Sequence, residues 1–326
     1  MLLRISITPF CAALVASLLL PATVAKVEGI LVHGQSPATP PAAARPGTAR
    51  ALQDAVDRAM RGRSGAAVVV DVESGRIVAQ HRLDIATRRR VLPGSTVKPF
   101  TLRALLEANA IRPDTTLLCP ISLQLDGHRM DCSHPRLPAP MDAASALAYS
   151  CNNYFAHFVA RLDDAQLDRA FARAGLTSVT GSAADEVAGE LRPARTPQQH
   201  SLKAIGAEAV NVTPVGLLHA YRRLALLRRQ GSQDETLRTV FAGLEASVTQ
   251  GMARAAAVEG LAVAGKTGTA GADEGSWTHA WFAGYAPADK PEIALVIFLE
   301  RGTGAADASL VARQVFEAFA QAQVKP

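Results

Sequence analysis

Residues 93–100, PGSTVKPF, mark the start of a helix that carries two candidate catalytic side chains. Pro99 lacks an N–H group, so a helix accepts it only near its first turn, which places the helix N-terminus close to Ser95. Free N–H groups and the helix dipole favour negative charge there. Lys98 lies one turn later on the same face, and a desolvated lysine can remove the proton of a serine hydroxyl. We interpret Ser95 as a candidate nucleophile and Lys98 as its base, although a capping serine followed by a solvated lysine would give the same pattern.

A second polar segment, Ser150-Cys151-Asn152, separates two helical patterns at residues 143–148 and 154–159. The hydroxyl of Ser150 and the amide of Asn152 could relay a proton and hold a substrate amide. Taken alone, the segment equally fits a helix break with capping residues.

The third segment, residues 265–269 (GKTGT), closes a strand of small and apolar residues. Glycines such as Gly268 within a strand usually mark a bulge or a close approach of another backbone, so a substrate strand could dock along this edge. Lys266 and the hydroxyls of Thr267 and Thr269 would then meet the carboxylate of the substrate. The alternative is a turn that follows an edge strand.

Strand patterns lie at both ends of the chain, and helical patterns fill the middle. Strands are expected at residues 66–72, 76–80, 262–269, 280–286 and 293–300. A first helix is expected to start at the cap Thr48, and a last helix ends the chain. We predict an α+β fold with one antiparallel sheet assembled from the two termini, helices from both termini over one face, and an inserted, mostly helical subdomain. A ligand cleft is expected where this subdomain meets the sheet.

The N-terminus predicts export. In residues 1–25, Arg4 precedes an apolar stretch that ends at a small-residue cleavage site. Residues 26–49 are rich in proline and alanine and are interpreted as a linker, so the folded domain is predicted to span residues 50–326. These features indicate an extracytoplasmic protein, periplasmic or secreted, which an uncleaved N-terminal segment could anchor to a membrane.

The composition is that of a folded protein without a nucleic-acid surface. Apolar residues make up 48% of the 326 residues, which is enough for a sizeable core. The net charge of +5 is spread along the chain. Residues 88–90 (RRR) are the only dense basic run. The sequence has no basic stripe interleaved with aromatic residues, so it does not predict nucleic-acid binding.

The three polar segments occur in the order typical of penicillin-recognising serine enzymes, whose signature combines Ser-x-x-Lys with Ser-Asp-Asn and Lys-Thr-Gly. The chain from about residue 65 to residue 320 resembles the penicillin-binding transpeptidase domain as a whole. The resemblance rests on residues 93–100, 150–155 (SCNNYF), 212–214 (VTP) and 281–287 (WFAGYAP).

This resemblance implies an acyl-enzyme mechanism on the D-Ala-D-Ala stem peptides of peptidoglycan, by transpeptidation or carboxypeptidation, with β-lactams as covalent inhibitors. It implies no cofactor, and the expected partners are the stem peptide and possible cell-wall or membrane proteins. The implied roles are nucleophile for Ser95, base for Lys98, proton relay to the leaving amine for Ser150, backbone binding for Asn152, steering of the carboxylate for Lys266 and Thr267, and oxyanion stabilisation by the N–H groups of Ser95 and Thr269.

Two other functions share these motifs. A serine β-lactamase would need a second base for water. Glu186 lies after Ser150, although its surroundings resemble a structural loop of the transpeptidases. A non-catalytic β-lactam sensor would normally continue into a signalling domain. Residues 206–210 (GAEAV) also depart from the more glycine-rich run that the family has before residues 212–214.

The cysteines outside the predicted signal allow two structures. Cys119 and Cys132 are nearly equidistant from the turn at residues 126–127 (DG), which predicts a disulfide across a hairpin with Cys151 free and buried. The alternative is a zinc site formed by Cys119, Cys132, His134 and Cys151. Some elongation-type members of the resembled family hold a metal in the corresponding region through different ligands. Because export favours oxidation, we predict the disulfide and no metal.

Overall fold

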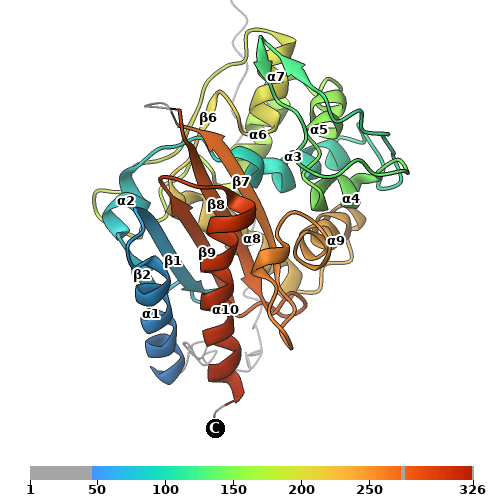
Figure 1. Ribbon diagram of the computed structural model, residues 1–326. Coiled ribbons are helices and arrows are strands. Elements are labelled where there is room, and N and C mark those ends of the chain that lie inside the picture. The colour runs from blue at the N-terminus through green and yellow to red at the C-terminus, as the bar shows by residue number, and fades with distance from the viewer. Residues whose placement is uncertain (1–45, 273–275, 325–326) are drawn as a thin grey trace, which may run out of the picture. The chain divides into compact units, whose positions relative to one another are not determined.

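The computed structural model describes residues 46–272 and 276–324, which form a mixed fold around a five-stranded antiparallel sheet (Figure 1). The strand order is β2-β1-β9-β8-β7, and each strand is antiparallel to its neighbours. The strands are β1 (Gly65–Asp71), β2 (Ile77–His81), β7 (Ala264–Gly271), β8 (Thr278–Ala286) and β9 (Ile293–Leu299). The pairing of β1 with β9 therefore joins the N-terminal hairpin to the C-terminal strands.

Both faces of the sheet are buried. Side chains alternate between the two faces along each strand, so successive residues belong to two different cores. In β9, Leu295 belongs to the core beneath α1 (Pro46–Met60) and α10 (Ser309–Val324). Its neighbour Val296 belongs to the core that includes α8 (Pro214–Arg229). The helices α1 and α10 pack side by side over one face, and α8 packs against the other (Figure 1).

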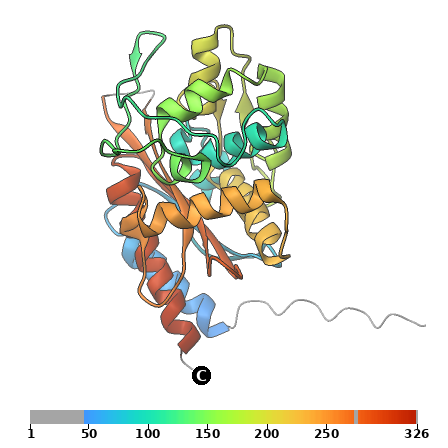
Figure 2. The same cartoon turned by 90° about the vertical axis from the view of Figure 1, so that its right-hand side faces the viewer.

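The rest of the chain between β2 and β7 forms seven further α-helices. They are α2 (Leu83–Arg88), α3 (Lys98–Glu107), α4 (Ala143–Ala148), α5 (Asn152–Val159), α6 (Asp164–Ala174), α7 (Pro197–Ala204) and α9 (Glu235–Thr249). The helix α2 packs against β1 and α8 beside the sheet, and the other six belong to the inserted subdomain. Two small pairs, β3 (Gln124–Leu125) with β4 (His128–Arg129) and β5 (Glu190–Leu191) with β6 (Val210–Asn211), complete it. The helix α3 packs against α5 and α6, while α9 contacts both α4 and β7 (Figure 2).

The predicted fold class, the sheet built from both termini and the covering helices are confirmed. The predicted signal lies outside the described residues, as does the linker up to residue 45. The predicted helix cap at Thr48 is wrong, because α1 already begins at Pro46 and Thr48 is a buried residue of this helix. Packing of α1 along α10 stabilises a helical turn that the local composition does not favour. No helix in the described ranges has the length and apolar character needed to span a membrane.

Candidate active site

Ser95 lies in a single 3₁₀ turn, Gly94–Val97, directly before α3. The prediction of a helix start at this serine is confirmed, and Lys98 follows one turn later. Ser95 is half-buried, whereas Lys98 is fully buried. The lysine head group therefore points into the protein and is not solvated as the alternative interpretation required.

Backbone contacts that leave no room for side chains hold this turn. The N–H group of Gly94 donates to the carbonyl oxygen of Gly206 at 3.0 Å, and a Cβ atom on Gly206 would overlap the carbonyl oxygen of Gly94. On the other side, a Cβ atom on Gly268 of β7 would lie 2.5 Å from the carbonyl oxygen of Pro93. The nucleophile turn is thus clamped between β7 and the segment that follows α7.

Two buried lysines meet at Ser150. Lys98 Nζ donates to Asn152 Oδ1 at 2.6 Å and to the carbonyl oxygen of Ser150 at 2.7 Å, and it lies 3.3 Å from Ser150 Oγ. Lys266 Nζ, from β7, donates to Ser150 Oγ at 2.8 Å. The backbone of Ser150 has a φ of 58°, a conformation that is uncommon for residues with a side chain and that clusters at active sites. All three sequence motifs therefore converge on one hydroxyl group.

Burial changes the protonation of both lysines. Burial lowers the pKa of Lys98 to about 8, against the attraction of the nearby cysteines. Burial also lowers the pKa of Lys266 well below its usual range, and the charge on Lys98 lowers it further. An uncharged fraction of Lys98, which can accept a proton, is thus present near neutral pH.

Two of the predicted side chains make contacts that the sequence did not indicate. Asn152 Nδ2 donates to the carbonyl oxygen of Met130 at 2.8 Å, so both ends of this amide are engaged and it orients Lys98. Thr269 Oγ1 accepts from the N–H group of Gly304 at 3.0 Å. No hydrogen bond joins Ser95 Oγ to Lys98 Nζ among the described residues. Catalytic hydrogen bonds often form only when substrate is bound.

Comparison with known proteins agrees with this arrangement. Residues 65–321 match the family model for the penicillin binding protein transpeptidase domain. The chain belongs to this family. The transpeptidase domain so defined contains every strand of the sheet, the helical subdomain and most of α10.

This transpeptidase domain is similar to Stage V sporulation protein D of Bacillus subtilis (strain 168), with 26% identity over 277 residues. The match covers 72% of this chain and 43% of the relative, so the chain spans less than half of that protein's length. The D,D-transpeptidase domain of a peptidoglycan glycosyltransferase from Eggerthella lenta superposes with a TM-score of 0.72 at 22% identity, covering 84% and 82% of the two chains. PBP2 of Pseudomonas aeruginosa, solved in complex with WCK 5153, gives 0.72 at 25% identity, covering 82% and 76%.

The expected disulfide between Cys119 and Cys132 is not formed in the transpeptidase domain. The two Sγ atoms lie 3.6 Å apart, whereas a disulfide holds them at about 2.05 Å. The hairpin that suggested the pairing is present, since β3 and β4 flank residues 126–127. The difference arises because Cys151, directly before α5, brings a third thiol within 3.8 Å of Cys132. All three thiols are free and buried, whereas the sequence analysis predicted this only for Cys151.

These three cysteines and His134 form one buried cluster whose ligand atoms all lie within 4.8 Å of one another. The hydrogen bond between the thiols of Cys132 and Cys151 lowers the pKa of Cys132 and raises the pKa of Cys151. His134 Nδ1 lies 2.7 Å from the carbonyl oxygen of Pro135, so this nitrogen carries the ring proton. The other ring nitrogen, Nε2, is buried and has no hydrogen-bond partner in the described structure. The cluster therefore offers three sulfur atoms and one free imidazole lone pair.

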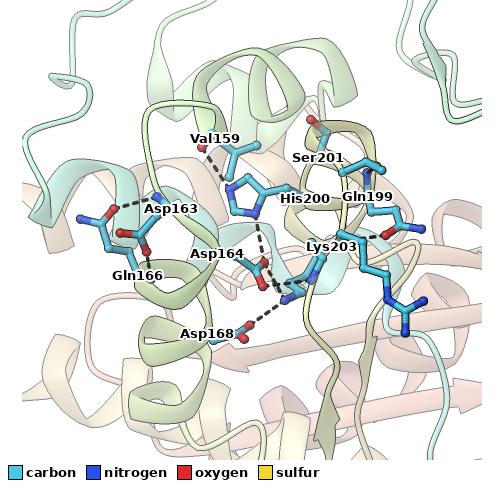
Figure 3. Close-up of polar contacts among 12 residues, drawn as sticks. Val159, Asp163, Asp164, Gln166, Asp168, Gln199, His200, Ser201 and Lys203 are labelled. Atoms are coloured by element: carbon cyan, nitrogen blue, oxygen red, sulfur yellow. Dashed lines mark hydrogen bonds and ion pairs between the residues drawn. The ribbon is translucent and has the colours of Figure 1, made fainter.

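A buried ion-pair group next to the site was missed by the sequence analysis (Figure 3). Lys203 of α7 is fully buried, and its Nζ donates to Asp164 at 2.7 Å and to Asp168 at 2.9 Å, both on α6. Burial acts to raise the pKa of Asp164, but hydrogen bonds from Lys203, the N–H group of Ala194 and His200 hold it below its usual value. The group ties α7 to α6. No sequence signal reveals it, because a lysine in a helical pattern is usually solvated.

Proposed function

We propose that this chain is a serine D,D-transpeptidase or D,D-carboxypeptidase that acts outside the cytoplasm on the D-Ala-D-Ala stem peptides of peptidoglycan. The observation that carries the proposal is the fully buried Lys98, one turn after Ser95, whose Nζ is bonded to Asn152 and Ser150. An uncompensated buried lysine is costly, and groups with such shifted pKa values cluster at functional sites.

In the proposed acylation, Ser95 Oγ attacks the carbonyl carbon of the D-Ala-D-Ala peptide bond while Lys98 Nζ takes the hydroxyl proton. The N–H groups of Ser95 and Thr269 stabilise the negative oxygen of the tetrahedral intermediate. Collapse breaks the C–N bond, and Ser150 Oγ gives its proton to the departing D-alanine amine while it takes up the proton held by Lys98 Nζ. The product is an ester between Ser95 and the shortened stem peptide.

The second half-reaction returns the enzyme to its starting state. An amine or a water molecule attacks the ester, Ser95 regains its proton, and the acyl group leaves as a cross-link or a free acid. In the first half-reaction Lys266 and Thr267 are assigned to the terminal carboxylate of the peptide, which leaves with D-alanine. Support for this comes from their position on β7, whose neighbouring Gly268 packs against the nucleophile turn.

Replacing Ser95 with alanine should abolish covalent labelling by a fluorescent penicillin, because no other serine in the described ranges lies at a helix start with a buried lysine one turn later. In-gel fluorescence measures the label, and peptide mapping of the wild type should place it on Ser95. Ser178→Ala, at an exposed serine, is the matched control and should keep the label. Label that survives in the Ser95→Ala variant, or that maps to Ser150, would contradict the proposal.

The same experiment separates this function from a β-lactamase. The carboxylate of Glu186 accepts hydrogen bonds from the N–H groups of Thr180 at 2.7 Å and Ser182 at 3.0 Å, so it holds a loop instead of activating water. We therefore expect stoichiometric labelling and an adduct that persists for minutes or longer. Rapid multiple turnover of nitrocefin would favour the β-lactamase instead.

We also propose that the cluster of Cys119, Cys132, Cys151 and His134 holds a structural zinc ion. In a tetrahedral site with Zn–S bonds of about 2.3 Å, neighbouring sulfur atoms lie about 3.8 Å apart. The Sγ separations of 3.6 Å and 3.8 Å fit this geometry. Nε2 of His134 has no hydrogen-bond partner in the described structure and is the proposed fourth ligand. The opposite ring nitrogen, Nδ1, is hydrogen-bonded to a backbone carbonyl, as is usual for a metal-bound histidine.

Backbone amides around the cluster support three thiolate ligands. The N–H groups of Ile121, Asn152 and Tyr154 point at Cys119, Cys132 and Cys151, at 3.3 Å, 3.2 Å and 3.4 Å respectively. Such donors offset the negative charge of metal-bound sulfur. A zinc ion here would fix the β3–β4 hairpin to the Ser150-Cys151-Asn152 turn, and it takes no part in the steps above.

Elemental analysis should find one zinc per chain, and His134→Gln should lose it together with about 5 °C or more of the thermal midpoint. His157→Gln, at an exposed histidine, is the control and should retain the metal. Alkylation without reductant should modify the three thiols only after chelation and unfolding. Absence of zinc together with a Cys119–Cys132 bridge in the intact mass would show that the metal site is wrong.

A further inference from the structure

The nucleophile turn contains a carbonyl group that the local helix does not pair. In a 3₁₀ helix each carbonyl oxygen accepts from the N–H group three residues later, and that of Ser95 accepts from Lys98 in this way. The residue three positions after Thr96 is Pro99, which has no N–H group. The first acceptor of α3 is the carbonyl oxygen of Val97, because Val97 is the N-cap of this helix. Thr96 is fully buried, so its carbonyl oxygen needs a donor from elsewhere in the fold.

Tyr221 of α8 supplies this donor. Its hydroxyl group donates to the carbonyl oxygen of Thr96 at 2.8 Å, across 125 positions of sequence. The tyrosine is fully buried, and its ring packs edge-on against Phe100 of α3 with ring centroids 5.5 Å apart. Burial raises the pKa of Tyr221 well above its usual value, so the hydroxyl group keeps its proton near neutral pH. The phenol is therefore a fixed donor and not a proton carrier.

The bonded carbonyl group lies between the two candidate catalytic residues. Three peptide units join Ser95 to Lys98, and the middle one carries the carbonyl group of Thr96. No hydrogen bond joins the two side chains within the part of the chain that the structure covers, so the backbone between them sets their relative placement. A rotation of the middle peptide unit changes the backbone dihedral angles on both of its sides and would turn the serine away from the lysine.

Two other contacts hold the turn from its beginning. The N–H group of Gly94 is bonded to the segment that follows α7, as described above. Trp281 Nε1, from β8, donates to the carbonyl oxygen of Leu92 at 3.0 Å. Both contacts fix backbone groups that precede Ser95, whereas the hydroxyl group of Tyr221 fixes one that follows it. The bond from Tyr221 thus restrains the part of the turn that leads to the lysine.

We propose that Tyr221 is a positioning residue of the proposed acylation, in which its hydroxyl group holds the peptide unit between Thr96 and Val97 and so sets the placement of Ser95 relative to Lys98. It acts through the turn and not on the substrate. Such placement matters, since a misplacement of about 1 Å can cost about 100-fold in rate. The proposal rests on the proposed function, because it takes the roles of the serine and the lysine from it.

Tyr221→Phe removes the hydroxyl group and keeps the ring, and Tyr154→Phe is its matched control. Tyr154 is also fully buried, and its hydroxyl group donates to the carbonyl oxygen of Thr115, outside the proposed site, at 2.9 Å. Each variant should lower the thermal midpoint by about 2–6 °C, because each leaves a carbonyl group without its donor. Only Tyr221→Phe should slow acylation. Its limiting rate constant at saturating penicillin should fall about 10–100-fold, while the dissociation constant of the non-covalent complex changes by less than about threefold.

Hydrogen exchange of the turn gives a second readout that needs no penicillin. The segment of residues 93–100 should exchange about tenfold faster in Tyr221→Phe than in the wild type, because the loss of one hydrogen bond makes local opening easier. Exchange of the same segment should stay unchanged in Tyr154→Phe. A purely structural role of both hydroxyl groups would lower both thermal midpoints without this difference.

A limiting rate constant of Tyr221→Phe within about threefold of the wild type, or an equal loss of rate in both variants, would overturn the proposal. Labelling of wild-type Ser95 combined with such a result removes the positioning role and keeps the acyl-enzyme. A wild type that penicillin does not label removes the acyl-enzyme. In that case faster exchange in Tyr221→Phe alone would still support the hold on the turn, and unchanged exchange would overturn it as well.

Discussion

Replacing Lys98 with methionine should slow acylation of Ser95 by a factor of about 10²–10⁴, the usual contribution of a general base. Methionine fills most of the space of the buried lysine but cannot accept the serine proton. The loss should appear as a lower rate constant of penicillin labelling, measured on protein whose folding is checked by its thermal midpoint. A rate within threefold of the wild type, taken as about unchanged, would exclude Lys98 as the base.

The pH dependence and a second buried lysine serve as controls for this result. Because burial lowers the pKa of Lys98 to about 8, the uncharged form grows as pH rises through this value. Wild-type acylation should therefore increase with pH and level off above about 8, and the Lys98→Met variant should lose this dependence. Lys203→Met removes an equally buried lysine outside the site, so it should reduce stability while the folded protein still acylates within about tenfold of the wild type.

Gly206→Ala should destabilise the protein by about 3 kcal/mol or more and slow acylation at least about tenfold. The residue has a φ of 77°, which alone costs an alanine about 1–2 kcal/mol. In addition, the new methyl group overlaps the carbonyl oxygen of Gly94, so the nucleophile turn has to move. Urea unfolding measures the first effect and the rate of penicillin labelling the second.

Gly231→Ala separates the backbone strain from the overlap. Gly231 has a similar φ of 69°, but a Cβ atom there meets nothing within 4 Å. This variant should cost only about 1–2 kcal/mol and leave acylation unchanged. If the two alanine variants behaved alike, the close approach of Gly206 to Gly94 would not be what positions Ser95.

The sequence was sufficient for the fold and for naming the motif residues that the structure brings together at Ser150, because both depend on local patterns. The runs that became β1 and β9 are short, apolar and bounded by turns, and Pro99 allows only one place for the helix start. The order of the three motifs then indicated the family to which the chain belongs. What these patterns could not give was the hydrogen-bond scheme, in which Asn152 holds Lys98 and Lys266 reaches Ser150.

The features that the sequence analysis got wrong or did not predict share one physical cause: each depends on contacts between segments that are distant in the sequence. The pairing of Cys119 with Cys132 was inferred from a turn, but Cys151, directly before α5, lies against both and makes a cluster of three thiols. The burial of Lys203 depends on α6, which brings two carboxylates to it from a distant part of the sequence. The hydrogen bond from Tyr221 to the nucleophile turn joins residues 125 positions apart, so it could not be anticipated either.

The pairing of β1 with β9 has a consequence for how the protein is made. A ribosome releases β1 long before β9, so the nascent chain holds an apolar hairpin with an open edge on β1 while the residues between these two strands are made. Sheets closed by such distant partners form slowly, and open edges invite aggregation. A chain cut short just before β9 would lose the strand that joins β1 to β8, and would be left with two separate hairpins for quality-control proteases to remove.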